Sequence, residues 1–313
     1  MLEWTDRDVD GLLVREARDP EVRERGRILL VPGSMQGWWA YERWMPVFAE
    51  AGWTPLAMSL PNHTGSRAVP EAEFLAYTPN DYANAVRTTL DNLRPDRDPG
   101  LRDPGLGSDP GQAPDQDLNP AQDQAKDQDF RPPVLLGHSM GGLVAQLVAE
   151  AYVPYALVLV STVGPGQLGP MRSTAYPKDR PVTMTREQVQ EVWFRHIAEE
   201  DLDALMDRLT PESPNVMNQY SNGSVTVDPA AIRCPVLVVG PENDRTPVHD
   251  TRTVAELLGA TPVVVPNVGH DMLLERPGLP AASTIVAWLD TLTPAAGPWD
   301  PQESDRGPTA RRR

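Results

Sequence analysis

One serine of this chain lies in a pattern that activated nucleophiles use. Ser139 is the centre of Gly137-His138-Ser139-Met140-Gly141, which follows the apolar run Val134–Leu136 and precedes a long apolar, alanine-rich segment. This order predicts a strand, a sharp turn and a helix, with the Ser139 hydroxyl held out of the sheet at the turn. Because a serine hydroxyl is a weak nucleophile at neutral pH, the pattern also requires a base and an acid nearby.

His270 is the expected base. It lies in Asn267–Asp271, directly after the last predicted strand, where a loop can carry its imidazole to a serine on a central strand. It would accept the Ser139 proton during attack and return it to the leaving group. The neighbouring Asp271 is badly placed to fold back onto the ring.

Asp244 is the expected acid. It lies in Gly240–Pro247, after the preceding predicted strand, and would hold the imidazole of His270 in the required tautomer. Two competing carboxylates, Glu242 and Asp250, lie off the expected turn position.

Two backbone N–H groups are expected to stabilise the oxyanion that forms when Ser139 attacks a carbonyl. The Met140 N–H stands at the start of the predicted helix, and the Ser34 N–H follows the short strand Arg27–Val31 and Pro32-Gly33. Since backbone supplies both donors, the side chains of Ser34 and Met140 would act mainly by shaping the pocket.

Strands and helices alternate along most of the chain, which predicts an α/β fold with a mostly parallel sheet and helices on both faces. Active groups then belong at the carboxyl ends of the strands. The expected strands are Gly11–Arg18 (as a strand or hairpin arm), Arg27–Val31, Thr54–Leu60, Val134–Gly137, Tyr155–Ser161, Val236–Gly240 and Pro262–Val265. The expected helices are Trp38–Ala51, Asn80–Leu93, Met140–Tyr152, Thr185–Asp207, Val248–Leu258 and Ser283–Leu292.

Composition divides the chain into a core, an insertion, a cap and a tail. Residues 95–132 repeat Asp-Pro-Gly and contain too few large apolar side chains to offset the entropy of ordering, so we expect a disordered insertion. Residues 163–228 leave the alternating pattern and are expected to form a small helical cap that keeps water from the serine. The core would comprise residues 1–94, 133–162 and 229–295, and residues 296–313 a flexible tail.

These motifs resemble those of the α/β-hydrolase superfamily over roughly residues 25–95 and 133–295, and most closely its esterase, lipase and hydroxynitrile-lyase-like branch. The resemblance implies a Ser139–His270–Asp244 triad and a sheet of about eight strands. Pro32 replaces a histidine that commonly braces the oxyanion loop, and Gln36 stands where lyase-like relatives often carry histidine. The matching segments are Val31-Pro32-Gly33, Gly137–Gly142, Gly240–Pro247, Gly269-His270 and Leu60–Ser66.

Large apolar side chains near these motifs are candidates for the walls of a substrate pocket. Their character favours a small or medium, mainly apolar substrate. The main candidates are Met35, Trp38, Trp193 and Phe194, with Trp39, Met140 and Met217 as further ones.

The other histidines have structural interpretations. We expect His138 to pack within the turn, His63 to brace a turn, His196 to be half-buried on a cap helix and His249 to be exposed. None of them has metal-ligand spacing to another, and no phosphate-binding glycine loop is present. We therefore expect no cofactor and no metal.

The net charge of −16 argues against nucleic acid and anionic membranes as partners. No apolar run approaches the roughly 18 residues of a membrane span, and the first residues are too polar and acidic for a signal peptide. The single cysteine, Cys234, excludes an internal disulfide and is expected to be buried and inert. These features predict a cytoplasmic protein whose partner is a small ester-like molecule, with homodimer formation left open.

A serine hydrolase is the function that these features favour, acting on a carboxylic ester, thioester, lactone or amide through an acyl-enzyme on Ser139. A hydroxynitrile-lyase-type enzyme would use the same residues as a base without acylation. That chemistry favours a cation in the cap, where Lys178 is the only lysine. A low-turnover receptor on this fold is a third alternative, which the intact set of serine, histidine and aspartate disfavours.

Overall fold

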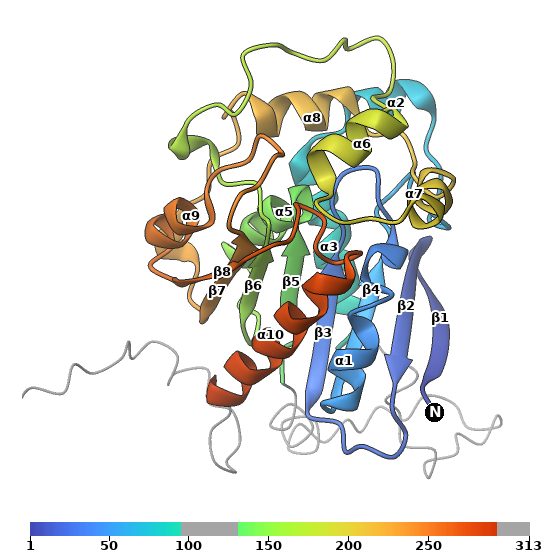
Figure 1. Ribbon diagram of the computed structural model, residues 1–313, viewed down its shortest axis with the longest axis vertical. Helices are drawn as coiled ribbons and strands as arrows, with labels where there is room; N and C mark the ends of the chain where they lie inside the picture. Colours follow the sequence, from blue (N-terminus) through green and yellow to red (C-terminus); the bar gives the residue numbers. More distant parts are fainter. Residues whose placement is uncertain (95–130, 293–313) are drawn as a thin grey trace, which may run out of the picture.

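An eight-stranded sheet forms the centre of the computed structural model, which describes residues 1–94 and 131–292 (Figure 1). The strand order is β1-β2-β4-β3-β5-β6-β7-β8, with β1, β2 and β4 antiparallel to one another in turn and all other neighbours parallel. The predicted α/β fold and the sheet of about eight strands are confirmed. The strands are β1 Glu3–Val9, β2 Leu12–Arg18, β3 Gly26–Val31, β4 Trp53–Met58, β5 Val134–His138, β6 Leu157–Val160, β7 Val236–Pro241 and β8 Thr261–Val265.

Helices cover both faces of this sheet. Because side chains alternate along a strand, Leu136 of β5 points into one apolar core and Leu135 into the other. The first core also takes side chains from α1 and α10, and the second from α3, α5 and α9. Burial on both faces explains why the central strands read as continuous apolar runs. These helices are α1 Met45–Glu50, α3 Pro79–Asn92, α5 Met140–Ala149, α9 Thr251–Leu257 and α10 Leu279–Leu292.

Residues 163–228, which we call the cap segment, contain three further helices. They are α6 Arg186–Trp193, α7 Glu199–Met206 and α8 Pro214–Ser221, and Figure 1 shows them beyond the carboxyl ends of the central strands. The short α2 (Glu71–Ala76) lies on the same side. No helix in the part of the chain that the structure describes has the length and apolar character of a bilayer span.

Two predicted helices are interrupted. Trp38–Ala51 divides into a 3₁₀ turn, Trp38–Tyr41, and α1, whose second residue is Pro46. Proline lacks the backbone N–H that a helix interior needs but fits a first turn, so it starts a new helix there.

The predicted helix Thr185–Asp207 breaks after Trp193. Phe194 is extended (φ −118°, ψ 144°), and the N–H groups of Arg195 and His196 donate to the buried carboxylate of Glu275 at 2.5 and 2.9 Å. A distant carboxylate therefore replaces the helical carbonyl acceptors, which the local sequence does not reveal.

The insertion predicted over residues 95–132 and the tail over 296–313 lie outside the described residues, except for Arg131 and Pro132, which precede β5.

Candidate active site

Ser139 occupies a strained turn between β5 and α5. Its backbone angles, φ 53° and ψ −122°, are rare for any residue with a side chain. The flanking glycines allow the turn: a Cβ on Gly141 would lie 2.3 Å from the Pro32 carbonyl oxygen, and one on Gly137 would lie 2.2 Å from the Gly141 carbonyl oxygen. The predicted strand, turn and helix are therefore present, with Ser139 at the turn.

A chain of hydrogen bonds joins the three residues predicted for catalysis. Nε2 of His270 lies 2.9 Å from Oγ of Ser139, and Nδ1 lies 2.8 Å from Oδ2 of Asp244. The other oxygen of Asp244 accepts the Thr246 N–H at 2.8 Å, which fixes the carboxylate. This arrangement can take a proton from the serine hydroxyl and stabilise the imidazolium that results.

The protonation of His270 reflects its surroundings. Burial lowers its pKa, but the charge of Asp244, its hydrogen bond and the charge of Asp271 raise the pKa more, to above the usual 6.5. At a pH above this raised pKa the ring is mainly neutral, and the raised pKa makes it a stronger base for the Ser139 proton.

The two backbone N–H groups predicted for an oxyanion hole belong to residues near Ser139. Met140 begins α5, where first-turn N–H groups have no helical acceptor, and Ser34 follows Gly33, whose Cβ position lies 3.1 Å from Cβ of Ser139. Within residues 1–94 and 131–292, neither the Ser34 nor the Met140 N–H has a hydrogen-bond acceptor. Both are free to donate to a ligand oxygen.

The sequence matches a family model, the alpha/beta hydrolase family, over residues 28–283. The chain belongs to the alpha/beta hydrolase family. This confirms the family expected from the sequence and the prediction of a hydrolase-fold enzyme. No curated protein sequence matches the chain.

Solved structures share the fold of this α/β hydrolase at low sequence identity. An N-acyl homoserine lactonase, AidH, aligns with a TM-score of 0.65 at 15% identity, over 95% of this chain and 99% of its own. An esterase of Thermogutta terrifontis aligns at 0.62 and 16%, over 93% and 99%. A monoacylglycerol lipase of Paleococcus ferrophilus aligns at 0.60 and 16%, over 94% and 100%.

A buried polar network lies behind the histidine. Asp271 accepts a hydrogen bond from Nε2 of Gln36, whose Oε1 lies 3.3 Å from Nδ1 of His138. Nε2 of His138 lies 3.2 Å from the His270 carbonyl oxygen. Burial and the nearby His270 lower the pKa of His138 to about 3, so this ring stays neutral and acts as a hydrogen-bonding residue, as expected.

Asp271 is not a partner of the His270 ring, in agreement with the sequence interpretation. It is fully buried, and Oδ1 has no hydrogen-bond partner among the described residues. Burial raises its pKa to about 7.

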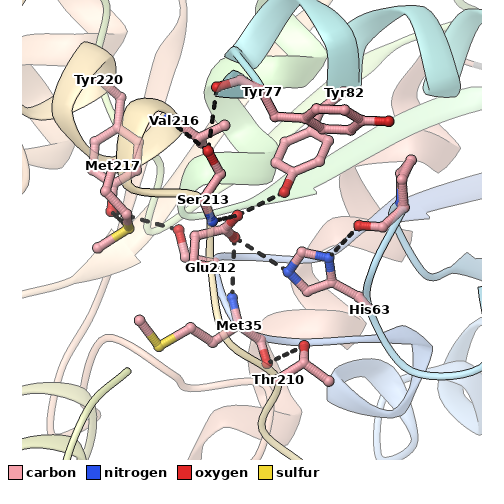
Figure 2. Close-up of polar contacts among 12 residues, drawn as sticks. Met35, His63, Tyr77, Tyr82, Thr210, Glu212, Ser213, Val216, Met217 and Tyr220 are labelled. Carbon is pink, nitrogen blue, oxygen red and sulfur yellow. Dashed lines mark hydrogen bonds and ion pairs between the residues drawn. The ribbon is translucent and has the colours of Figure 1, made fainter. Parts of the chain in front are cut away.

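Glu212 of the cap segment contacts Met35, in the loop that follows β3 (Figure 2). Its Oε2 accepts the Met35 N–H at 3.3 Å and lies 3.2 Å from Nε2 of His63, while Oε1 accepts the Tyr82 hydroxyl at 2.6 Å. The Met35 carbonyl accepts the Thr210 N–H at 3.0 Å. Both sides of Met35, which has φ 66°, are therefore tied to the cap segment.

Glu212 and His63 are a buried ion pair. Burial raises the pKa of Glu212, but His63 and the hydrogen bonds from His63, Tyr82 and Ser213 lower it more. Burial lowers the pKa of His63, and Glu212 raises it more. His63 braces its turn as expected, through a contact to the Pro61 carbonyl at 2.9 Å, and its partner Glu212 was not expected.

A second buried glutamate, Glu275, ties the cap segment to the His270 loop. Besides Arg195 and His196, it accepts the Gly269 N–H at 3.0 Å. The Asp271 N–H donates to the Trp193 carbonyl at 2.9 Å. The loop that carries His270 and the loop that carries Ser34 and Met35 are thus each anchored to the cap segment by one buried carboxylate.

A cavity of about 240 Å³ opens beside Ser139 and His270. Met35, Trp193 and Met217 line it, as predicted. Trp38 and Phe194, also predicted to line the pocket, do not.

The positions of Trp38 and Phe194 outside the cavity lining each have a physical explanation. The Trp38 ring is half-buried under the guanidinium group of Arg15, 4.3 Å from the ring centroid. Phe194 follows the end of α6, and its extended backbone places the side chain in the core instead. Neither Trp39 nor Met140 lines the cavity; the Trp39 indole donates to Thr64 at 3.0 Å.

Polar lining residues were missed, among them Tyr176, Tyr220 and Arg172. Tyr220 and Met217 come from α8, which was not predicted, although Ser213-Pro214 is a recognisable start signal: the Ser213 hydroxyl caps the Val216 N–H.

The remaining single residues differ in part from expectation. His196 is exposed and lies outside any helix, with Nε2 3.1 Å from Oδ1 of Asn267. His249 is half-buried rather than exposed, near the Gly169 carbonyl. Cys234 is half-buried, and burial raises the pKa of its thiol to about 12, so little thiolate forms at neutral pH. Within the described ranges, no group of three or more potential ligand side chains could hold a metal ion.

Proposed function

We propose that this chain is a serine hydrolase that cleaves a small or medium, mainly apolar carboxylic ester, or a related thioester, lactone or amide, through an acyl-enzyme on Ser139. The observation that carries the proposal is the hydrogen-bond chain from Ser139 through His270 to Asp244 at a strained turn. The cavity beside it, about 240 Å³, lies a little below the usual range of ligand pockets, about 300–1,000 Å³, and so favours a small substrate.

In the first half-reaction, Oγ of Ser139 attacks the carbonyl carbon while Nε2 of His270 takes the hydroxyl proton. The N–H groups of Ser34 and Met140 stabilise the oxyanion. The bond to the leaving oxygen then breaks, and His270 gives its proton to the departing alkoxide.

In the second half-reaction, His270 takes a proton from water, which attacks the acyl carbon. The acyl–Ser139 bond breaks, Ser139 regains a proton from His270 and the carboxylic acid leaves. Asp244 keeps its charge throughout and stabilises the imidazolium.

Labelling with a fluorophosphonate probe, together with turnover of short and medium para-nitrophenyl esters, tests this proposal. Wild type should label and turn over, and Ser139→Ala should do neither. Ser173→Ala, which changes an exposed serine of the cap segment, is the matched control and should behave as wild type.

The alternatives give different outcomes. A folded wild type that neither labels nor turns over would favour a receptor. Cleavage of a cyanohydrin without labelling would favour lyase chemistry; Lys178, the cation considered for it, is exposed and does not line the cavity. A cytoplasmic location and a small-molecule partner remain part of the proposal, with homodimer formation open.

A further inference from the structure

Arg172 is the only arginine or lysine among the described residues that line the cavity beside Ser139. It is exposed, whereas Asp271, the only carboxylate-bearing residue of the same described lining, is fully buried. The cation therefore lies at the solvent side of the cavity and the carboxyl group at its inner side.

The guanidinium group of Arg172 is held in place. Its Nη1 donates to the Tyr176 hydroxyl at 2.8 Å, and its Cζ lies 4.4 Å from the centroid of that ring. Tyr176 is fixed to α8, because its N–H donates to Oδ1 of Asn218 at 2.7 Å and its carbonyl accepts from Nδ2 at 3.0 Å. The Arg172 N–H donates to the Ser221 carbonyl at 3.2 Å. A cation mounted in this way loses little freedom when it binds an anion.

No described carboxylate forms an ion pair with Arg172, whereas Arg186 of the same cap segment pairs with Glu199 and Asp203. The chain has 44 acidic and 28 basic side chains, so possible carboxylate partners outnumber the cations. An arginine that lines a cavity without a partner among the described residues is therefore unexpected. One of its five N–H donors is used, which leaves enough for a carboxylate in bidentate geometry.

Other side chains that line the cavity suit a ligand whose central part is apolar. Met35, Val192, Trp193 and Met217 contribute apolar side chains to the same cavity. A ligand that places its carbonyl at Ser139 and an anion at Arg172 would lie along these groups.

We propose that Arg172 binds a carboxylate on the substrate, so that the preferred substrate is a small ester with one free carboxylate remote from the scissile bond. The proposal rests on the hydrolytic function above and specifies its substrate class. It adds a charged group to the mainly apolar substrate that the sequence favours, because the sequence does not place Arg172 at the cavity.

Matched pairs of esters test this inference. One pair varies the acyl side: mono-para-nitrophenyl adipate against para-nitrophenyl hexanoate. The other varies the alcohol side: para-acetoxybenzoate against para-acetoxybenzamide. The quantity measured is the ratio of kcat/KM for the anionic ester to kcat/KM for its neutral partner, in wild type, R172Q, R172K and R180Q. Arg180 is an exposed arginine of the same segment that does not line the cavity, so R180Q is the control.

Wild type should prefer the anionic member of at least one pair. R172Q should lower kcat/KM for that ester by about five-fold and leave the neutral ester within about two-fold, because an exposed charge-assisted contact is lost. R172K should retain part of the preference, R180Q all of it, and added salt should weaken it in wild type but not in R172Q.

A wild type that prefers the anionic member of neither pair, or an R172Q variant that changes both members equally, would overturn the inference while leaving the hydrolytic function intact. Turnover of no ester by wild type would instead contradict the proposed function itself.

Discussion

At the residue scale, Asp244 decides how His270 titrates. Its charge and hydrogen bond counter the effect of burial and hold the pKa of His270 above 6.5. Since His270 must be neutral to accept the Ser139 proton, kcat/KM should fall as the pH drops through that raised pKa.

The variant Asp244→Asn tests this dependence. Loss of the negative charge lowers the pKa of His270, so the acidic limb of the pH profile should move to lower pH. The rate should fall by about 10³-fold or more, as it does in serine proteases when the corresponding aspartate is changed to asparagine. Asp250→Asn, which changes the exposed cap of α9, is the control and should leave the profile unchanged. An acidic limb at the wild-type position in Asp244→Asn would contradict the assignment.

The sequence identifies Ser139, His270 and Asp244 because each follows a predicted strand, and parallel strands end at one edge of the sheet. It does not identify the contact of Gln36 with Asp271, 235 positions away, or the cation at the cavity. Those depend on how loops fold over the sheet edge, which no local pattern records.

At the element scale, the loop of Ser34 and Met35, which carries one of the proposed oxyanion donors, contacts the cap segment through Glu212. The carboxylate accepts the Met35 N–H, next to Ser34, and the Met35 residue keeps a left-handed backbone that costs free energy without such partners. The position of the Ser34 N–H should therefore change when this acceptor is altered.

Glu212→Gln should lower kcat for a para-nitrophenyl ester by about ten-fold or more while KM stays within about two-fold, because the oxyanion donor acts mainly in the transition state. Affinity for an alkyl boronic acid, which forms a tetrahedral adduct with serine, should fall in parallel. Tyr82→Phe removes a donor to the other oxygen of Glu212 and serves as the control. A Glu212→Gln variant with lower melting temperature but unchanged kcat would show a purely structural role.

The helices of the cap segment also show a limit of prediction from local sequence patterns. The helical pattern of Thr185–Asp207 is real on both sides of the break, since α6 and α7 each form. The break itself arises from Glu275, a residue about 80 positions away that captures the Arg195 and His196 N–H groups.

At the scale of the whole molecule, the buried pair of His63 and Glu212 should give stability a pH dependence. The pKa of His63 is raised, so its contribution is complete below about 6.5 and is lost as the pH rises through its folded value. The pKa of Glu212 is lowered, so its contribution is present above about 4.5 and is lost as the pH falls through its folded value.

Urea unfolding measures this contribution. It compares wild type with the double variant His63→Asn with Glu212→Gln from about pH 4 to 9, a range that covers both titrations. The difference in free energy of unfolding should be largest between pH 4.5 and 6.5, the ordinary pKa values of the two groups. A difference that does not vary with pH would rule out the ion pair.

The composition of residues 96–130 gives a separate prediction about the whole chain. Replacing them with a short Gly/Ser linker should change the melting temperature by less than about 3 °C and leave ester turnover intact, because a sequence with so few large apolar residues can bury little surface to stabilise the fold. A large loss of either would show that this segment contributes to the fold or to the site.

The overall fold could be predicted because both faces of the central strands are buried, so these strands are apolar runs separated by segments of helical periodicity. β1 was the strand missed: its burial pattern is mostly exposed, and it pairs with β2 at the sheet edge, where no apolar run is required.

In the proposed mechanism, Ser139 forms an acyl-enzyme. The most direct measurement is rapid acid quenching during turnover of para-nitrophenyl butyrate, followed by digestion and mass spectrometry. We expect a butyryl group on Ser139 that appears and decays at rates matching turnover, and none in Ser139→Ala. Turnover without that adduct, or with the acyl group on another residue, would contradict the mechanism.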